Sequence, residues 1–267
     1  MKKPALGLIA IAALIGTPVF AADMAVKAPP SPAPTASPPH DWSGFYLGLN
    51  VGGSWDTSSA TTTAIPGDFF GLCSECVPNS NQNFHASQFT GGIQGGYNWQ
   101  VGHLVTGIEL DAETFRNIGS ITTSRAFPVS PTNTQTVNST FNSQWLFTAR
   151  PRLGLAADSF LFYGTGGLAV TRLNATWSYT DDFNAPCDCE SAEVSSTRVG
   201  WILGGGIEDA LPGNWLIGLE YLHTDFGTIF ATSNNLMVPG GVHWTDTFNH
   251  SINLTTNIMR VRLSRQF

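Results

Sequence analysis

The sequence contains few charged residues. Asp, Glu, Lys and Arg make up 12% of its 267 residues, about half the share that is usual in a soluble domain. Lysine occurs only at positions 2, 3 and 27, and nine arginines follow. The formal net charge is −7, whereas a nucleic-acid-binding face must be basic. The composition therefore argues against a well-solvated globular surface and against a nucleic-acid partner.

Long apolar runs and catalytic motifs are also missing. Beyond the first residues no segment offers 18 uninterrupted apolar side chains, which excludes a bundle of membrane-spanning helices. His223 and Asp225 stand close together in "HTD", but no Gly-x-Ser-x-Gly elbow or other nucleophile motif accompanies them. The histidines form no pair at metal-ligand spacing. We therefore expect neither an enzyme nor a cofactor or metal.

The first residues have the pattern of an export signal. Two lysines precede an apolar run at 6–20, and Ala21 suits the last position before a cleavage site. A membrane-anchoring helix, the alternative, would need about 20 apolar residues. We expect a signal peptide at 1–21, a Pro-rich periplasmic spacer at 22–41 that cannot form a core, and one barrel domain at 42–267.

Runs of about ten residues with alternating character recur along this domain. In "GFYLGLNVGGSW", for example, Phe45, Leu47 and Leu49 lie on one face while small or polar residues lie on the other, as a β-strand requires. Leu146 breaks the alternation of its segment, and the segment 160–177 is apolar and Gly-rich on both faces. The predicted strands are 44–55, 89–100, 104–114, 144–155, 160–177, 197–209, 214–225 and 257–267.

The connections between these strands alternate in length. Only "VGH", "AADS" and "ALPG" separate three of the pairs, whereas 56–88, 115–143, 178–196 and 226–252 are long and polar. Short turns at one end, long loops at the other and an even strand count are typical of outer-membrane barrels. The pattern predicts an all-β fold, an eight-stranded antiparallel transmembrane β-barrel with short periplasmic turns and four long extracellular loops.

A soluble eight-stranded barrel is the alternative fold, and it would place its apolar face inside. Here aromatic residues gather near strand ends, as the interfacial girdles of membrane barrels do, and charged residues occupy the opposite face. We therefore expect charged residues to line the lumen. Three roles for these charges stay open: a packed polar plug, a narrow selective pore and a purely structural network. The predicted lumen residues are Glu109, Asp111, Glu113, Arg150, Arg152, Arg198, Glu208, Glu220, Arg260 and Arg262.

Four cysteines fall in two of the predicted loops, Cys73 and Cys76 in the first and Cys187 and Cys189 in the third. Cysteines in an exported chain favour disulfides, and four of them allow three connectivities. Metal binding by four thiolates is the alternative. The oxidising envelope works against the metal site, so we expect disulfides, but the sequence alone does not choose among the connectivities.

Several segments resemble the alphaproteobacterial outer-membrane immunogenic protein family, porin-family surface barrels distantly similar to OmpA-type and opacity proteins. They are "DWSGFYLGLNVGGSW", "GGIQGGYNWQ", "RLGLAADSFLFYGTGGLAVT", "GWILGGGIEDAL", "WLIGLEYLHTDFGT" and "RVRLSRQF". The resemblance covers residues 41–267 and implies an eight-stranded barrel in the outer membrane of a Gram-negative bacterium. It also implies that Phe267, a C-terminal aromatic, is the signal for the barrel-assembly machinery, and that some members bind haemin or host surfaces.

We expect a structural, surface-exposed barrel with a charged, largely filled lumen. Its partners would be outer-membrane lipids and the assembly machinery. The alternatives are a narrow diffusion porin and a loop-borne receptor for haem or a host-surface ligand. Small residues on the lumen face favour the porin because they would leave space: Gly48, Gly52, Gly92, Gly96, Gly204 and Gly206.

Overall fold

A computed structural model describes residues 40–65, 67, 70, 79–183, 188–238 and 242–267. The predicted signal peptide and nearly all of the predicted spacer lie outside these residues. No helix in the described ranges is long and apolar enough to cross a membrane. The strands are β1 (Gly44–Asp56), β2 (Ser58–Ile65), β3 (Asn79–Phe84), β4 (Ser87–Val101), β5 (Leu104–Phe127), β6 (Ser130–Ala157), β7 (Phe160–Asp181), β8 (Asp188–Leu211), β9 (Trp215–Val238) and β10 (Val242–Gln266).

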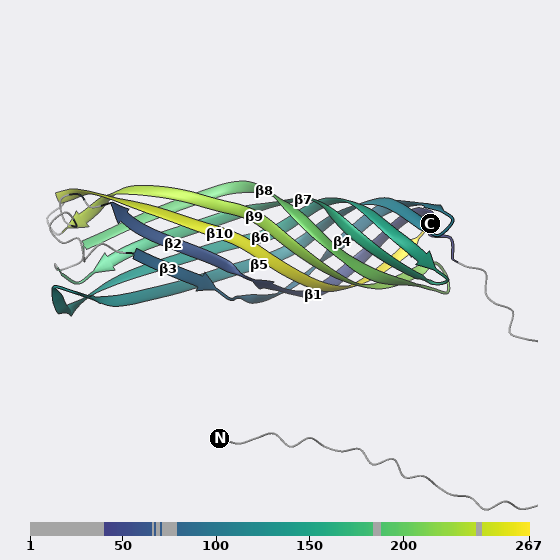
Figure 1. The fold of residues 1–267 in the computed structure, drawn as a ribbon, viewed down its shortest axis with the longest axis horizontal. Coiled ribbons are helices and arrows are strands. Elements are labelled where there is room, and N and C mark those ends of the chain that lie inside the picture. Colours follow the sequence, from purple (N-terminus) through teal and green to yellow (C-terminus); the bar gives the residue numbers. More distant parts are fainter. Residues whose placement is uncertain (1–39, 66, 68–69, 71–78, 184–187, 239–241) are drawn as a thin grey trace, which may run out of the picture. The chain divides into compact units, whose positions relative to one another are not determined.

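Eight of the strands close a barrel. β1 pairs with β4, the strands β4 to β10 pair in chain order, and β10 returns to pair with β1. This closing pair is antiparallel and sets Tyr46 opposite Gln266 and Asp56 opposite Thr256. All other neighbours are antiparallel as well. The predicted eight-stranded antiparallel barrel is confirmed (Figure 1).

The three short turns lie where the sequence predicts them. They join β4 to β5, β6 to β7 and β8 to β9. Gly102, Asp158, Gly213 and Asn214 adopt positive φ there, between 54° and 81°. Tight hairpins need this left-handed backbone, which Gly, Asn and Asp adopt at the least cost. These turns mark the periplasmic end of the barrel, where the C-terminus also lies (Figure 1).

The predicted long loops are mostly strand, which corrects the sequence reading. β5 to β10 are 22 to 28 residues long and continue through segments predicted as loops. Those segments are rich in Thr, Ser and Asn, and their outward faces are polar except at a few positions such as Ile118 and Phe230. Along each strand these outward residues nevertheless alternate with buried residues that face inward, such as Phe141, Leu173 and Trp177. A strand that has left the hydrocarbon no longer needs an apolar outer face, so the pattern used to find strands ends before the strands do.

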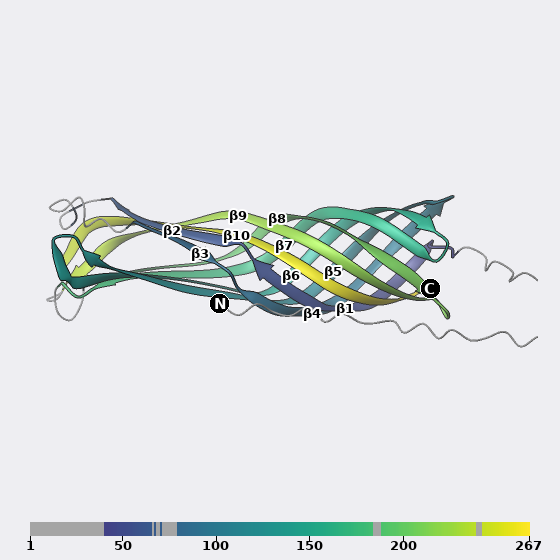
Figure 2. The ribbon, with the colours of Figure 1, turned by 60° about the horizontal axis from the view of Figure 1, so that its bottom comes forward.

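The first predicted loop folds into the hairpin β2–β3, which replaces β1 and β4 in the outer half of the wall. β2 pairs with β10 from Ile65–Thr247 to Ser59–Asn253, and β3 pairs with β2. Gln82 of β3 donates hydrogen bonds of 3.0 and 3.1 Å to Thr123 Oγ1 and Val137 O. Figure 2 shows this hairpin beside β10, in the half of the barrel away from the C-terminus.

The half of the barrel near the short turns carries the lipid-facing surface. Its outward side chains are large, apolar and exposed, for example Leu49, Leu153 and Leu203 at about 60%. We call this surface the lipid-facing band. At its outer limit stands an aromatic girdle formed by Trp55, Phe89, Trp145, Trp201 and Tyr221. Trp and Tyr prefer the boundary between hydrocarbon and head groups, so the girdle sets the depth of the barrel in the membrane.

Candidate functional site

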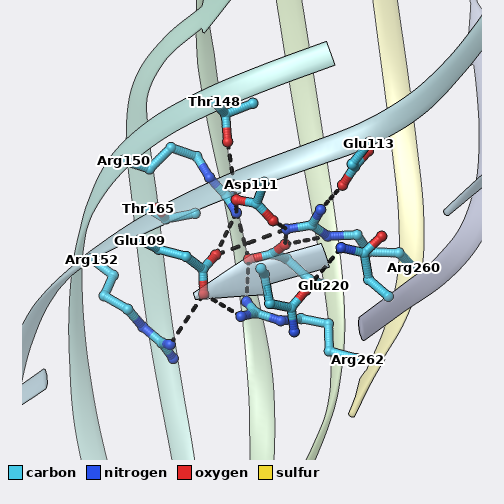
Figure 3. A network of polar contacts seen from close by, with 12 residues as sticks. Glu109, Asp111, Glu113, Thr148, Arg150, Arg152, Thr165, Glu220, Arg260 and Arg262 are labelled. Atoms are coloured by element: carbon cyan, nitrogen blue, oxygen red, sulfur yellow. Dashed lines mark hydrogen bonds and ion pairs between the residues drawn. The ribbon is translucent and has the colours of Figure 1, made fainter. Parts of the chain in front are cut away.

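The candidate site is the charged layer in the lumen at the level of the lipid-facing band. Nine of the ten predicted residues come together there, all with buried side chains, and Figure 3 labels all of them except Glu208. They are Glu109, Asp111, Glu113, Arg150, Arg152, Glu208, Glu220, Arg260 and Arg262. We call these nine residues the charged layer.

Arg198 lies outside the charged layer, which corrects its predicted place. It is ten residues from Glu208 along β8, a separation of about 33 Å of strand. Its Nε donates a 3.1 Å hydrogen bond to Ser196 Oγ. No carboxylate among the described residues pairs with it. Strand parity assigned Arg198 to the inner face, but it did not indicate the height of the residue in the barrel.

Arg150 is one centre of the charged layer. Its Nη2 contacts Glu109 Oε1 at 2.5 Å and Asp111 Oδ2 at 2.6 Å. Its Nη1 lies 3.4 Å from Glu220 Oε1. Thr148, two residues earlier on β6, donates a 3.0 Å hydrogen bond to Asp111 Oδ2. One guanidinium therefore joins acidic residues of β5 and β9.

Arg260 approaches the same acidic residues from β10. Its Nη2 lies 2.7 Å from Asp111 Oδ1 and 2.5 Å from Glu220 Oε2. Its Nη1 also pairs with Glu113 Oε1. Arg150 and Arg260 thus bind the two oxygens of Asp111 from opposite sides. Charge-assisted pairs of this kind are the stronger hydrogen bonds of proteins.

Arg262 and Arg152 extend the network toward the periplasmic end. Arg262 Nη1 contacts Glu220 Oε1 at 2.9 Å, and Arg262 Nη2 pairs with Glu109 Oε2. Arg152 Nη2 contacts Glu208 Oε2 at 3.0 Å. Most of the acidic residues therefore contact two or more guanidinium groups each, and these contacts join the layer into one connected network (Figure 3).

Two tyrosines complete the layer, and sequence reasoning assigned them no role. Tyr46 donates a 2.7 Å hydrogen bond to Glu109 Oε2, and Tyr163 donates one of 2.9 Å to Glu220 Oε1. The guanidinium of Arg152 lies 4.0 Å from the centroid of the Tyr163 ring, a cation–π distance. The alternation in the first strand did place Tyr46 on the lumen face. The Gly-rich strand that contains Tyr163 shows no clear alternation, so the sequence did not indicate which way Tyr163 points.

Neighbouring side chains and backbone atoms lie close to the glycines of the lumen face, which the sequence offered as a sign of space. A Cβ atom on Gly96 would lie 2.4 Å from the Tyr46 hydroxyl oxygen, and one on Gly206 would lie 2.7 Å from that of Tyr163. The other lumen glycines meet side chains or backbone at similarly short distances: Gly48, Gly52, Gly92 and Gly204. At Gly96 and Gly206 the missing side chain makes room for a tyrosine, and at the other positions it allows a close approach of the neighbouring strand.

The side chains of the charged layer are almost inaccessible to solvent. Side-chain exposure in its ion pairs is between 0 and 4%. Charges removed from water are stable only when they are paired and hydrogen-bonded. Five carboxylates face four guanidinium groups, which leaves one formal negative charge when all are ionised.

Apolar side chains cover the charged layer on its extracellular side. Phe115, Leu146, Leu222 and Ile258 belong to one buried cluster in the barrel interior. We call this cluster the outer apolar layer; its other members are Ala60, Phe84, Phe141, Ala169, Leu173, Ala175, Trp177, Ile202, Phe226, Ile229, Ile252 and Leu254. Leu146, which breaks the strand alternation in the sequence, is one of its inward residues. Lumen positions therefore change from charged to apolar along the barrel.

A second buried cluster, the periplasmic apolar layer, closes the other end of the lumen. It contains Trp42, Tyr46, Val105, Ala156, Leu161, Tyr163 and Leu216. Trp42 stands just before β1 and is fully buried. Its backbone N–H donates a 2.7 Å hydrogen bond to Gln100 Oε1.

The chain before β1 is attached to the last strand. Gln266 Nε2 donates to the carbonyl oxygens of Asp41 and Ser43 at 2.9 and 2.8 Å, and Gln266 Oε1 lies 2.7 Å from His40 Nε2. The Ser43 N–H donates to Asp41 Oδ1 and holds the pKa of that carboxyl below its ordinary value. His40 and Asp41, assigned to the spacer by the sequence, therefore contact the barrel.

Farther out, a buried His–Glu contact lies in the lumen. His250 Nε2 is 3.1 Å from Glu190 Oε1, and His250 Nδ1 is 3.0 Å from Thr62 Oγ1. The imidazole stacks on Trp177 at 5.3 Å. Beyond it follows a further apolar cluster that includes Phe127 and five aromatic or aliphatic neighbours. Sequence reasoning placed His250 in a loop and missed this contact.

The remaining predicted sites are only partly described. Cys73, Cys76 and Cys187 lie outside the described residues, so the disulfide stays a prediction. Phe267 is 72% exposed, and its N–H donates a 2.8 Å hydrogen bond to Phe45 O. No group of three or more His, Cys, Asp or Glu side chains suited to a metal occurs in the part of the chain that the structure describes.

Comparison with known proteins agrees with this architecture. The chain is 33% identical over 224 residues to the 31 kDa outer-membrane immunogenic protein of Brucella melitensis, covering 82% of this chain and 86% of the relative. It is 27% identical to the 22 kDa outer membrane protein of Rhizobium leguminosarum bv. viciae, over 71% of this chain and 66% of that protein.

Among solved structures, the outer membrane protein OprG from Pseudomonas aeruginosa aligns with 84% of this chain and 97% of its own, at 13% identity and a TM-score of 0.47. Residues 19–267 match the family described as the outer membrane protein beta-barrel domain. That match spans nearly the whole chain and includes every strand of the barrel. The chain therefore belongs to this family of outer-membrane β-barrel proteins.

Proposed function

We propose that the protein is a structural, surface-exposed barrel with a filled lumen that does not conduct. The observation that carries the proposal is the burial of charged and apolar side chains at successive levels of the interior. The charged layer is dry and lies between the outer and the periplasmic apolar layers. An eight-stranded barrel is just wide enough for side chains to fill. An ion entering this lumen would have to displace large apolar side chains and then break paired charges.

The polar part of the barrel beyond the lipid-facing band supports a role in surface presentation. Strands β5 to β10 continue past the aromatic girdle, and β2–β3 completes the wall around a packed interior. Such a wall extends beyond the lipid-facing band on the extracellular side. The name of the Brucella melitensis relative, an outer-membrane immunogenic protein, is in keeping with this role.

Planar-bilayer recordings of the purified protein test the proposal. We expect no stepwise conductance at voltages at which a general porin, added as a positive control, conducts. Steady single-channel steps that require correctly folded protein would contradict the filled-lumen function and favour the narrow diffusion porin. Titration with haem, monitored by the absorption spectrum, tests the alternative that the protein is a haem receptor. Saturable binding would support that alternative.

A further inference from the structure

Two exposed arginines stand on the outer wall at the limit of the lipid-facing band. Arg116 lies in a register shift between β5 and β6, from Thr114 to Asn117. Arg172 on β7 lies opposite the next shift, between Ser143 and Leu146 of β6. Both arginines are exposed. The two irregularities therefore bring two outward-pointing cations to corresponding register positions on β5 and β7, the strands on either side of β6.

We propose that Arg116 and Arg172 form a docking surface for the phosphate groups of an outer-leaflet phosphoglycolipid. The aromatic girdle sets their depth. Trp145, the girdle residue of β6, stands in the register shift between the two arginines. On the extracellular side of this level the outward positions of β7 are Asn174, Thr176, Ser178 and Thr180. The guanidinium groups therefore lie where hydrocarbon gives way to head groups.

The charge of this wall matches an anionic head group. The acidic residues of β5 all point into the lumen, β6 has none, and Asp181 of β7 is buried. No carboxylate therefore faces outward from the described residues of β5, β6 or β7. Four of the nine arginines pair within the charged layer, whereas these two are offered to the membrane surface. Arginine is the preferred partner for bidentate binding of phosphate.

The geometry allows both arginines to serve one lipid. They are separated by one intervening strand, which places their backbones about 10 Å apart. Arg172 is held in position because its Nε and Nη2 donate to Ser195 Oγ at 3.3 and 3.1 Å. Ser195 in turn donates a 2.6 Å hydrogen bond to Asn174 Oδ1. A guanidinium has five N–H donors, so Arg172 retains three for a ligand.

The other rim of the barrel offers a natural control. Arg265 lies near the periplasmic end, where its guanidinium sits 5.9 Å from both the Trp215 and Phe267 rings. It cannot reach the outer leaflet. Arg125, farther out on β5, is exposed and lies well beyond the girdle. Substituting these two arginines changes the protein charge equally without touching the proposed surface.

Native mass spectrometry of the protein in a neutral detergent tests the proposal. The probes are lipid A with both phosphates, the same lipid dephosphorylated, and inorganic phosphate. We expect wild type to retain phosphorylated lipid A. The Arg116→Gln, Arg172→Gln double variant should bind it roughly 30-fold more weakly, since each basic residue near an anionic surface contributes about a five- to six-fold gain. The Arg125→Gln, Arg265→Gln variant should bind as wild type does.

Folding and specificity are checked in the same experiment. Heat modifiability on gels reports whether each variant is folded, and the Arg116→Lys, Arg172→Lys variant keeps the charge and should retain most of the binding. Equal binding of phosphorylated and dephosphorylated lipid, or unchanged binding by the folded glutamine variant, would overturn the proposal. Displacement of the lipid by low concentrations of inorganic phosphate would also overturn it, because the site would then be one for free phosphate.

Discussion

Replacement of Arg150 by methionine tests whether the charged layer acts as a unit. Arg150 contacts Glu109, Asp111 and Glu220 within 3.4 Å, and its side chain is fully buried. Methionine keeps much of the volume but removes the charge, so that five carboxylates face three guanidinium groups. Breaking a buried ion pair by removing one partner costs about 3–5 kcal/mol. We expect a loss of this size in the free energy of unfolding.

Urea unfolding of the protein in lipid vesicles, followed by tryptophan fluorescence and by heat modifiability, measures this loss. Arg125→Met is the matched control, because Arg125 is exposed and lies outside the lumen. A substitution at such a surface position usually changes stability by less than about 0.5 kcal/mol. Small and equal effects of the two substitutions would refute the reasoning, since they would mean that the inner charges are solvated.

A second substitution distinguishes charge imbalance from lost packing. In Arg150→Met the carboxylate of Asp111 keeps only Arg260 and the hydroxyl of Thr148. Adding Asp111→Asn removes one of the uncompensated charges. If charge imbalance causes the loss, the double variant should be more stable than Arg150→Met by about 1–3 kcal/mol. Additive losses would instead assign the effect to packing.

Three further predictions concern the glycine face, the periplasmic layer and the C-terminus. Gly96→Val should destabilise the barrel by about 1–3 kcal/mol in the same urea assay, because its side chain would overlap that of Tyr46; a neutral result would show that the lumen has free space. Trp42→Ala should lower stability by about 3–5 kcal/mol yet leave bilayers silent, since the outer apolar layer remains; channel activity would make Trp42 the main seal. Deletion of Phe267 should reduce heat-modifiable, membrane-inserted protein in cells far more than it lowers the stability of refolded protein; comparable losses would reduce its role to strand packing.

Much of the barrel follows from the local sequence. The alternation of period two identifies the membrane-spanning part of every strand of the closed ring and assigns the outward face of all of them except β7, for example Leu47, Leu49 and Val51 of β1. The short turns show which strands form hairpins, and they place these hairpin turns at one end of the barrel. These features are readable because side-chain direction in a strand depends only on position along the chain. The same rule assigned nine buried charges to the lumen.

The structure departs from the sequence reading where distant segments meet. Which guanidinium meets which carboxylate depends on the stagger of the strands around the barrel, so that Arg198 shares its parity with Arg150 but not its height. The polar segments beyond the membrane continue as strands because their neighbours offer pairing and an apolar interior, as at Phe84 against Phe141. The amino-acid composition of these polar segments resembles that of loops, so composition alone did not identify them as strands.

The sequence by itself therefore determined the fold class, the lipid-facing surface and the charged character of the inner face, because each depends on local alternation between hydrocarbon and polar surroundings. Only the tertiary structure decided which atoms occupy the space beside the lumen glycines. The glycines that suggested space lie beside Tyr46 and Tyr163, and Trp42 is buried below them. Whether a barrel interior is open or closed depends on the packing of side chains from all its strands at each height, and that packing is set by ring closure and stagger rather than by any single segment.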